Sequence, residues 1–308
     1  MKTMAEGKDI QLSQIVDTGE PEKVIEEILR IFYFHYAEDS ALRIQLAFSQ
    51  VRSLFAGEFP GYRECLAEYH DFSHTMSVLL ATARLLDGYN IERVFLPEDL
   101  AIQLLLAALL HDTGYIQEDW DTEGTGARYS RQHEQRSIEF LRRHAEVFEI
   151  EEREVEPIIR FIQSTDLKTD FARISFISEH EQDAGAMLGS ADILGQMSDR
   201  AYLEKLLFLY HEFREAGISG YETEFDILRK TREFYAAVKG RLRDTYLHMF
   251  ELATHHFRER YEANQNLYIV AVDRQMAYLD KIVSDETTNF RNKLKRGDQA
   301  KLNERQAG

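Results

Sequence analysis

The sequence predicts an all-α fold, and two observations support that prediction. Only 16 glycines and 4 prolines occur in 308 residues, too few of the turn residues that a fold of many short strands requires. Hydrophobic residues recur along most of the chain at spacings of three and four, which is typical of one face of a helix. With 44% hydrophobic and 30% charged residues, the chain has the composition of a globular protein with a sizeable core.

The helical spacing is interrupted by clear start and stop signals. Pro97 and Gly114 flank one helix, since proline suits the first helical turn and glycine suits the end. Gly88 is expected to break another, and Ser178 with Glu181 has the spacing of a capping box. The helices are expected over residues 21–32, 41–55, 62–86, 97–114, 133–147, 155–163, from 178 through 192, 200–216, 224–262 and 265–285. The polar segment from Gln117 to Tyr129 is expected to be a loop.

The predicted organisation is a flexible N-terminus over 1–20, a single all-helical domain over 21–290 and a charged flexible tail over 291–308. The tail is poor in apolar residues, so it cannot bury enough surface to become ordered. No segment resembles a signal peptide or a membrane span, and we therefore expect a cytoplasmic protein without a membrane partner. The long helices after residue 200 either pack on the core or form a homo-oligomer.

Charge and cysteine content exclude some function classes. There are 37 Lys and Arg against 54 Asp and Glu, a formal charge of −17, which disfavours binding to a nucleic acid polymer. Cys65 is the only cysteine, so an internal disulfide and a multi-cysteine metal site are both excluded.

Polar, titratable residues occur at three places where the helices are otherwise apolar. His70 and His74 are four residues apart in YHDFSHT, a spacing that places both imidazoles on one face of a helix. His111 and Asp112 follow the apolar run LAALL, and Asp192 lies among apolar residues in LGSADILGQM. Burying such groups without partners is costly, and a metal ion or a hydrogen-bond network removes that cost. We therefore expect the three places to converge on one centre.

In order and spacing, these residues resemble the H…HD…D signature of HD-domain metal-dependent phosphohydrolases. The resemblance covers residues from about 66 to 212. Within it, YHDFSHT, ALLHDTGY, IQSTDL and the helix of Asp192 are similar to the catalytic core of class I cyclic nucleotide phosphodiesterases. The resemblance implies an HD-type helical bundle with a helical C-terminal extension. It also implies an enzyme that cleaves a small-molecule phosphoester with metal-activated water.

The resemblance assigns roles to individual residues. His74, His111, Asp112 and Asp192 would bind a first divalent metal ion, and Asp112 would also bridge to a second. Imidazole and carboxylate ligands suit Mn, Fe, Co, Ni or Zn, and a hydrated Mg can share the bridging carboxylate. The catalytic residues would be Asp112 and His70, with His70 as the acid that protonates the leaving oxygen.

Three further residues are candidates for contacts to the second metal or the phosphate. His133 lies in RQHEQRSIEF, a stretch that resembles the histidine-glutamate segment after the HD pair in that family. Asp166 in QSTDL matches a position that contacts metal-bound water in the phosphodiesterases, although Asp also caps helices and turns. Lys168 is a candidate phosphate contact, but lysine is most often simply exposed.

Substrate and reaction class stay open at this point. Residues 240–250 read GRLRDTYLHMF, without the glutamine that binds the purine in cyclic nucleotide phosphodiesterases. One alternative is an HD-fold di-iron oxygenase, which needs more histidine ligands, and His144 and His180 are the remaining histidines before Asp192. The other alternative is a noncatalytic metal-binding sensor or interaction module.

Overall fold

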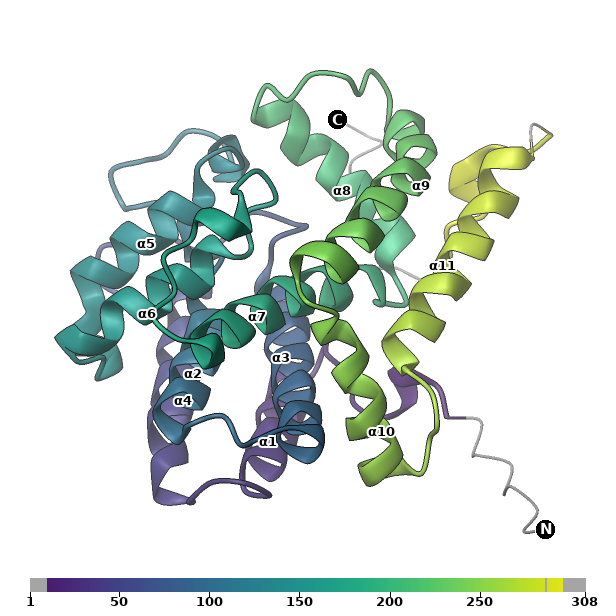
Figure 1. Cartoon of the computed structure of the whole chain (residues 1–308). Coiled ribbons are helices and arrows are strands. Elements are labelled where there is room, and N and C mark those ends of the chain that lie inside the picture. Colours follow the sequence, from purple (N-terminus) through teal and green to yellow (C-terminus); the bar gives the residue numbers. More distant parts are fainter. Residues whose placement is uncertain (1–9, 286, 296–308) are drawn as a thin grey trace, which may run out of the picture.

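The computed structural model describes residues 10–285 and 287–295, and it confirms the all-α prediction (Figure 1). Over these residues the chain forms helices and turns without a strand, with a single isolated bridge between Tyr62 and Glu118. The α-helices are α1 (Pro21–Phe32), α2 (Leu42–Phe55), α3 (Phe72–Glu92), α4 (Glu98–Leu110), α5 (His133–His144), α6 (Glu152–Gln163), α7 (Glu179–Met197), α8 (Tyr202–Glu215), α9 (Glu224–Gly240), α10 (Ala253–Tyr261) and α11 (Leu267–Ser284).

Two almost entirely buried helices, α3 and α4, lie at the centre of the bundle. Every residue of α3 from His74 to Asn90 is buried, and so is every residue of α4 from Ala101 onward. Helix α3 packs against α1, α4, α7 and α10. Because α4 follows α3 after a short connection, the two run antiparallel, and the start of α3 lies beside the end of α4. The His74 and His111 rings meet there, with centroids 5.6 Å apart.

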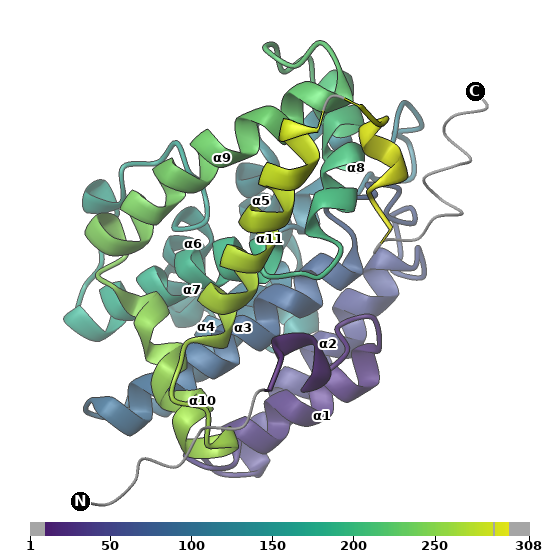
Figure 2. The ribbon, with the colours of Figure 1, turned by 90° about the vertical axis from the view of Figure 1, so that its right-hand side faces the viewer.

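The other helices surround this centre. In Figure 1, α5 and α6 form one flank, α7 crosses in front of α3, and α8 and α9 lie above α7. Helix α11 packs on α7, α8 and α9, and the view in Figure 2 shows it along the outside of that group. The 3₁₀ turn Leu12–Gln14 lies against α11. The core is therefore continuous from α1 to α11.

The predicted helix over 62–86 is wrong at both ends. It begins only at Phe72, because the Asp71 side chain accepts a hydrogen bond from the backbone N–H of His74 at 2.9 Å and caps the helix. His70 therefore precedes the helix instead of sharing a face with His74. At the other end the helix continues through Gly88 to Glu92. Gly88 therefore does not end the helix. Its lack of a side chain instead allows the carbonyl oxygen of Leu252 to approach closely.

The predicted helix over 224–262 is also wrong, because the chain bends between α9 and α10. A π-helical turn covers Arg241–Thr245, and Leu247 and His248 have positive φ angles of 52° and 59°. Tyr246 is fully buried at this bend and its hydroxyl donates to the carbonyl oxygen of Ser164 at 2.6 Å. This tertiary contact outweighs the helical preference of the segment.

The packed part of the chain extends beyond both predicted domain boundaries. Leu12, Ile15 and Val16 pack against the core, so the predicted flexible N-terminus over 1–20 is too long. At the other end, Arg291 pairs with Glu224 and Leu294 is buried, so the predicted start of the tail at 291 is too early. The remaining parts of both predicted segments, 1–9 and 296–308, lie outside the described residues. No helix in the described ranges has the length and apolarity needed to cross a membrane.

Gly88→Ala should destabilise the protein, because its Cβ would lie 2.0 Å from the carbonyl oxygen of Leu252. Forcing α3 away from the segment at Leu252 should lower the free energy of unfolding in urea by about 1–3 kcal/mol. Gly240→Ala is the matched control, since a Cβ there meets nothing within 4 Å and alanine favours helix. Equal stability of the two variants would show that the contact between Gly88 and Leu252 is not tight.

Candidate metal centre

Four side chains from three regions of the bundle converge at the end of α4. His74 lies in the first turn of α3, His111 and Asp112 follow α4, and Asp192 lies in α7. The Nε2 atoms of His74 and His111 are each 3.2 Å from Oδ2 of Asp112. Oδ1 of Asp192 is 3.4 Å from the His74 Nε2 and 3.9 Å from the His111 Nε2. The fold therefore brings together the four residues that the sequence predicts to meet.

Local structure orients the imidazole of His111 and fixes the backbone of His74. The Nδ1 of His111 lies 2.8 Å from the carbonyl oxygen of Ala108, so Nδ1 donates this bond and leaves the Nε2 lone pair facing the centre. His74 is held in place by the capped start of α3. Gly195 allows α7 to approach α3, since a Cβ there would lie 3.0 Å from the Ser77 backbone. That close approach brings Asp192 toward His74.

The donor atoms of this centre fit a divalent metal ion. His74, His111 and Asp112 are 4%, 1% and 3% exposed, and one ligand atom from each lies within 4.8 Å of the other two. The two Nε2 atoms and Oδ2 of Asp112 are buried without a well-formed hydrogen bond. Buried polar atoms are normally satisfied, and a metal ion would satisfy all three together. Imidazole and carboxylate suit first-row divalent metals.

The histidines and carboxylates of the centre stabilise one another's charged forms. Burial alone would lower the pKa of His74, but the carboxylates of Asp112 and Asp192 outweigh it and raise that pKa to about 10. Burial would also lower the pKa of His111, but the carboxylate of Asp112 outweighs burial and raises it. Burial would raise the pKa of Asp112, yet His111 and His74 hold it well below its usual range. In the metal-free protein at neutral pH, His74 therefore carries a proton where a cation would bind.

His133 lies on the other side of Asp112. Its Nε2 is 3.5 Å from Oδ1 of Asp112 and 3.3 Å from Oε1 of Glu134, and its Nδ1 faces the carbonyl oxygen of Ser130. Burial lowers the pKa of His133 to about 4 and raises that of Glu134 to about 7. The two oxygens of Asp112 thus face different histidines, which is the arrangement that a carboxylate bridging two metal ions needs.

His70 borders the centre from the segment before α3. Its Nδ1 lies 2.6 Å from Oε2 of Glu212 in α8, and the backbone N–H of Tyr69 donates to the other Glu212 oxygen at 2.8 Å. The ring stacks on Tyr115 with centroids 4.2 Å apart, and Tyr115 stacks on His133 at 4.6 Å. The Nε2 of His70 is 3.4 Å from the Tyr115 hydroxyl. His70 is therefore held on two sides, with Nε2 on the side of Tyr115.

Asp166 and Lys168 line the same cavity as the centre, but neither forms a hydrogen bond or an ion pair with the four converging side chains. The Asp166 carboxylate accepts from the backbone N–H of Lys168 at 2.8 Å and from the Thr169 hydroxyl at 2.7 Å. Asp166 therefore caps a turn, which is the alternative role that the sequence suggests for it. Lys168 is exposed. None of the residues 117–129 of the polar loop lines the cavity.

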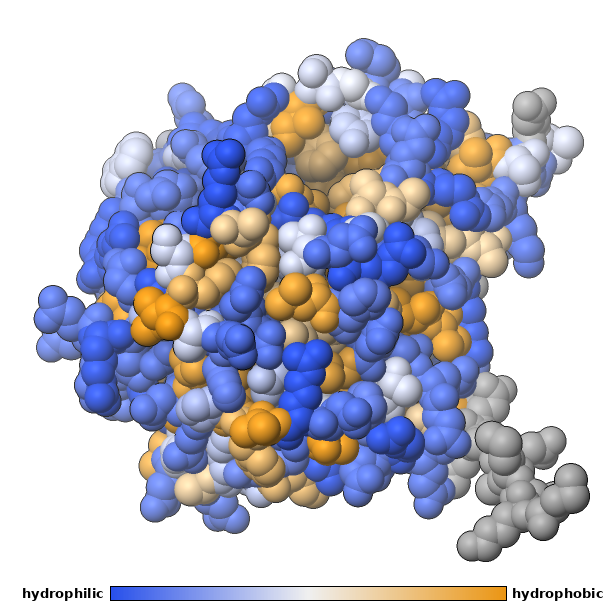
Figure 3. Space-filling model, viewed as in Figure 1, coloured by the Kyte–Doolittle hydropathy of each residue, from blue (hydrophilic) through white to orange (hydrophobic). Residues whose placement is uncertain are grey.

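The cavity beside the centre has a volume of about 340 Å³ and two different ends. The centre and its histidines form one end. Leucines, isoleucines and aromatic residues of α8, α9 and the connection between them line the other end: Leu206, Leu209, Phe213, Ile218, Tyr221, Ile227 and Phe234. Figure 3 shows a hollow with apolar walls at the surface between α8 and α9. A ligand that reaches the centre through this cavity meets an apolar wall.

Three residues of the centre are not predicted from the sequence. Tyr115 lies between two histidine rings, Glu212 holds His70, and Glu134 faces His133. Glu212 carries a usable signal, because it is an acidic residue in the apolar segment FLYHEF and is 4% exposed in the structure. Tyr115 carries no such signal, because tyrosine is common in cores.

A protein-family model matches the chain over residues 60–270. The chain belongs to the Npun_R2479-like family. The matched region contains the whole centre, from His70 to Glu212. No curated protein and no solved structure matches the chain. The description of the Npun_R2479-like family names no activity, so the resemblance of the chain to HD-domain enzymes stays a prediction.

Substituting a converging ligand should remove metal from the protein. We expect His111→Ala to lower the affinity for Mn or Co at least about tenfold, because substituting even a residue that only supports a metal ligand lowers metal affinity by about that factor. His180→Ala is the control, because His180 does not line the cavity. Metal content after dialysis, measured by mass spectrometry, checks this. Equal metal in both variants would contradict the assignment.

Metal binding at neutral pH should release protons. The pKa of His74 in the metal-free protein is about 10, so at pH 7 its imidazole carries a proton that a metal ion must displace. Affinity should therefore rise from pH 6 to pH 9. The raised pKa of His74 also contributes to the folding stability of the metal-free protein. This contribution is complete below pH 6.5, the ordinary pKa of histidine, and is lost as the pH rises toward 10. Calorimetry in two buffers of different ionisation enthalpy measures the protons; pH-independent binding without release would contradict the coupling.

Proposed function

We propose that this protein is a metal-dependent phosphohydrolase that cleaves a small phosphoester. The observation that carries the proposal is the set of buried, unsatisfied donor atoms of His74, His111 and Asp112, with Asp192 beside them. These four residues would hold one divalent ion, and Asp112 with His133 would contribute to a second. Bound divalent ions supply an activated water and neutralise charge on the phosphoryl oxygens.

His70 is the residue that we propose as general acid. Its Nδ1 donates to the Glu212 carboxylate at 2.6 Å, which leaves Nε2 as the atom that delivers a proton to the leaving oxygen. Glu212 fixes the orientation of the His70 ring. Catalytic imidazoles are generally oriented by such a hydrogen-bonded neighbour. Tyr115 limits rotation of the ring by stacking on it.

The cavity supports a phosphoester with an apolar group. The residues beyond the centre are mainly apolar, and Lys168 and Lys230 are the basic residues among those that line it. An apolar wall favours an aryl or alkyl group by burial. Such a wall offers few hydrogen-bond partners for a nucleobase. We therefore propose that the ester carries an apolar substituent that lies against α8 and α9.

The oxygenase alternative has less support in the structure. It needs further histidines around a second iron, and His144 and His180 do not line the cavity. His144 instead lies 2.9 Å from the hydroxyl of Tyr62 and packs among aromatic rings. The sensor alternative has no specific observation in its favour, and turnover in a hydrolysis assay separates it from an enzyme.

Hydrolysis assays with added Mn, Co, Mg or Fe test the proposed function. The panel contains aryl phosphomonoesters and diesters, nucleotides and cyclic nucleotides. We expect metal-dependent release of product, with a higher kcat/KM for aryl esters than for nucleotides because of the apolar wall. Metal binding without turnover on any ester would favour a sensor, and it would contradict the enzyme proposal.

Separating metal binding from proton transfer tests the role of His70. His70→Asn should retain metal but lose roughly 100- to 10,000-fold in kcat, the usual contribution of a general acid. The loss should shrink for an ester with a very acidic leaving group, which needs no proton. His111→Ala, in contrast, should lose metal and activity together. Normal kcat for His70→Asn with a poor leaving group would overturn its assignment as the acid.

A further inference from the structure

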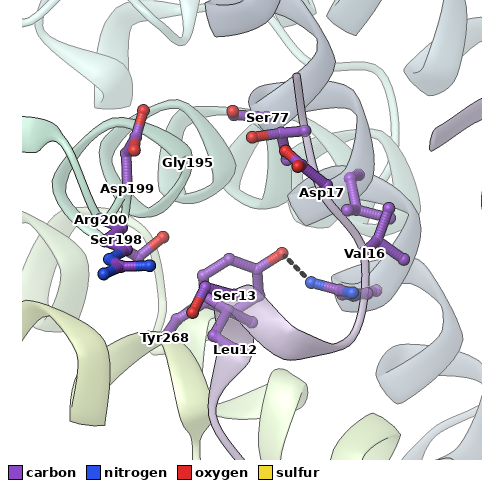
Figure 4. Close-up of a pocket in the computed structure, with 13 residues that line it drawn as sticks. Leu12, Ser13, Val16, Asp17, Ser77, Gly195, Ser198, Asp199, Arg200 and Tyr268 are labelled. Carbon is purple, nitrogen blue, oxygen red and sulfur yellow. Dashed lines mark hydrogen bonds between the residues drawn. The ribbon is translucent and has the colours of Figure 1, made fainter. Parts of the chain in front are cut away.

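Arg84 is a buried arginine on α3 that lies away from the metal centre. It is 2% exposed and is among the largest fully buried side chains of the protein. Its guanidinium group lies 5.5 Å from the ring of Phe257 and 5.8 Å from that of Tyr268. One hydrogen bond is formed, from Nη1 to the hydroxyl of Tyr268 at 3.1 Å, which is the dashed line in Figure 4.

This guanidinium has no counter-charge in contact with it among the residues that the structure describes. It takes part in none of the ion pairs within 4.0 Å, and its Nε and Nη2 atoms are buried without a hydrogen-bond partner. The nearby Glu27 already accepts bonds from Arg30 and from the hydroxyl of Tyr261. An arginine buried without an anion is costly, so its position needs an explanation.

A cavity of about 190 Å³ adjoins Arg84. Its walls come from α3, from the end of α7 and the residues after it, from α11 and from the N-terminal segment 12–18. Figure 4 shows Ser13, Ser77 and Ser198 around the space. The Ser77 hydroxyl donates to the carbonyl oxygen of Ser73 at 2.9 Å, so Ser13 and Ser198 supply the available hydroxyl groups. Leu12, Val16 and Leu80 supply apolar parts of the wall.

Neither acidic residue of the lining forms an ion pair with Arg84. Asp199 pairs with Lys205 at 2.6 Å and accepts from the backbone N–H of Ala201. Asp17 accepts from the backbone N–H of Gly19 at 2.9 Å. Arg84 has no such partner, and Arg200 also lines the cavity. Arg84 is therefore a buried cation beside the cavity without a counter-charge, and its positive charge favours an anion there.

We propose that this cavity binds a small oxyanion, a carboxylate or phosphate group, with Arg84 as its principal ligand. A guanidinium presents parallel N–H donors that match the oxygens of such groups, and serine hydroxyls donate to the remaining oxygens. An apolar cavity of about 150 Å³ is enough for benzene, so this one has room for a small organic acid or phosphate.

The site is separate from the metal centre but shares its helices. The two cavities have no lining residue in common. Ser77 lies one turn after His74 on α3, and Gly195 follows Asp192 by a similar step on α7. An anion would thus add contacts where α3 and α7 pack together. The N-terminal segment forms the outer wall, and it would become more protected when an anion binds.

Calorimetric titration of the chelator-treated, full-length protein with inorganic phosphate and, separately, with malonate tests the proposal. We expect saturable binding of at least one, and the ratio of the two affinities distinguishes phosphate from carboxylate recognition. Arg84→Met, which keeps the volume but removes the charge, should weaken binding at least tenfold. Arg52→Met, an exposed arginine, and Lys168→Met, in the metal-centre cavity, are controls that should keep it.

Hydrogen exchange on the wild-type protein gives a second, variant-independent result. With the anion that binds, amides of residues 12–18 should exchange more slowly, while those of the connection between α8 and α9 should not change. This result decides the question if Arg84→Met does not fold. Failure of both anions to bind the wild type, binding that Arg84→Met retains, or protection confined to the metal-centre cavity would overturn the proposal.

Discussion

The close contact between α3 and α7 is the constraint on which the candidate centre depends. Gly195 lies against the backbone of Ser77, and a larger residue at that position would separate the two helices. Asp192 lies just before Gly195 and His74 just before Ser77, so the same contact sets the distance of 3.4 Å between their polar atoms. Since α4 packs on both helices, its end delivers His111 and Asp112 to the same point.

This arrangement places charge where burial opposes it. Burial alone would disfavour protonated His74 and ionised Asp112, yet each stabilises the charged form of the other. The protein therefore holds these donors buried and close together before any cation arrives, which is the preorganisation that a metal site requires. Arg84 is another buried charge on α3, but its hydrogen bond goes to the hydroxyl of Tyr268 and not to a carboxylate.

The supporting residues come from distant parts of the chain. Glu212 on α8 orients His70, and Gly114 allows close approach of the carbonyl oxygen of His133, where a Cβ would lie at 2.0 Å. The same helix α8 also supplies the apolar wall of the cavity. One element therefore orients the proposed acid and shapes the proposed substrate site. Specificity and proton transfer are expected to be coupled through α8.

The sequence by itself determined the all-α class, most helix positions and the four residues that converge, because helical spacing and polar residues in apolar runs are local signals. It also pointed to His133. The capped start of α3 after His70, the bend at Tyr246 and the stacking of Tyr115 were decided by the tertiary structure alone. Each depends on contacts between residues far apart in sequence, such as Tyr246 with Ser164, which no local pattern reports. Arg84 shows the same limit, since an arginine in a sequence does not reveal whether it has a partner.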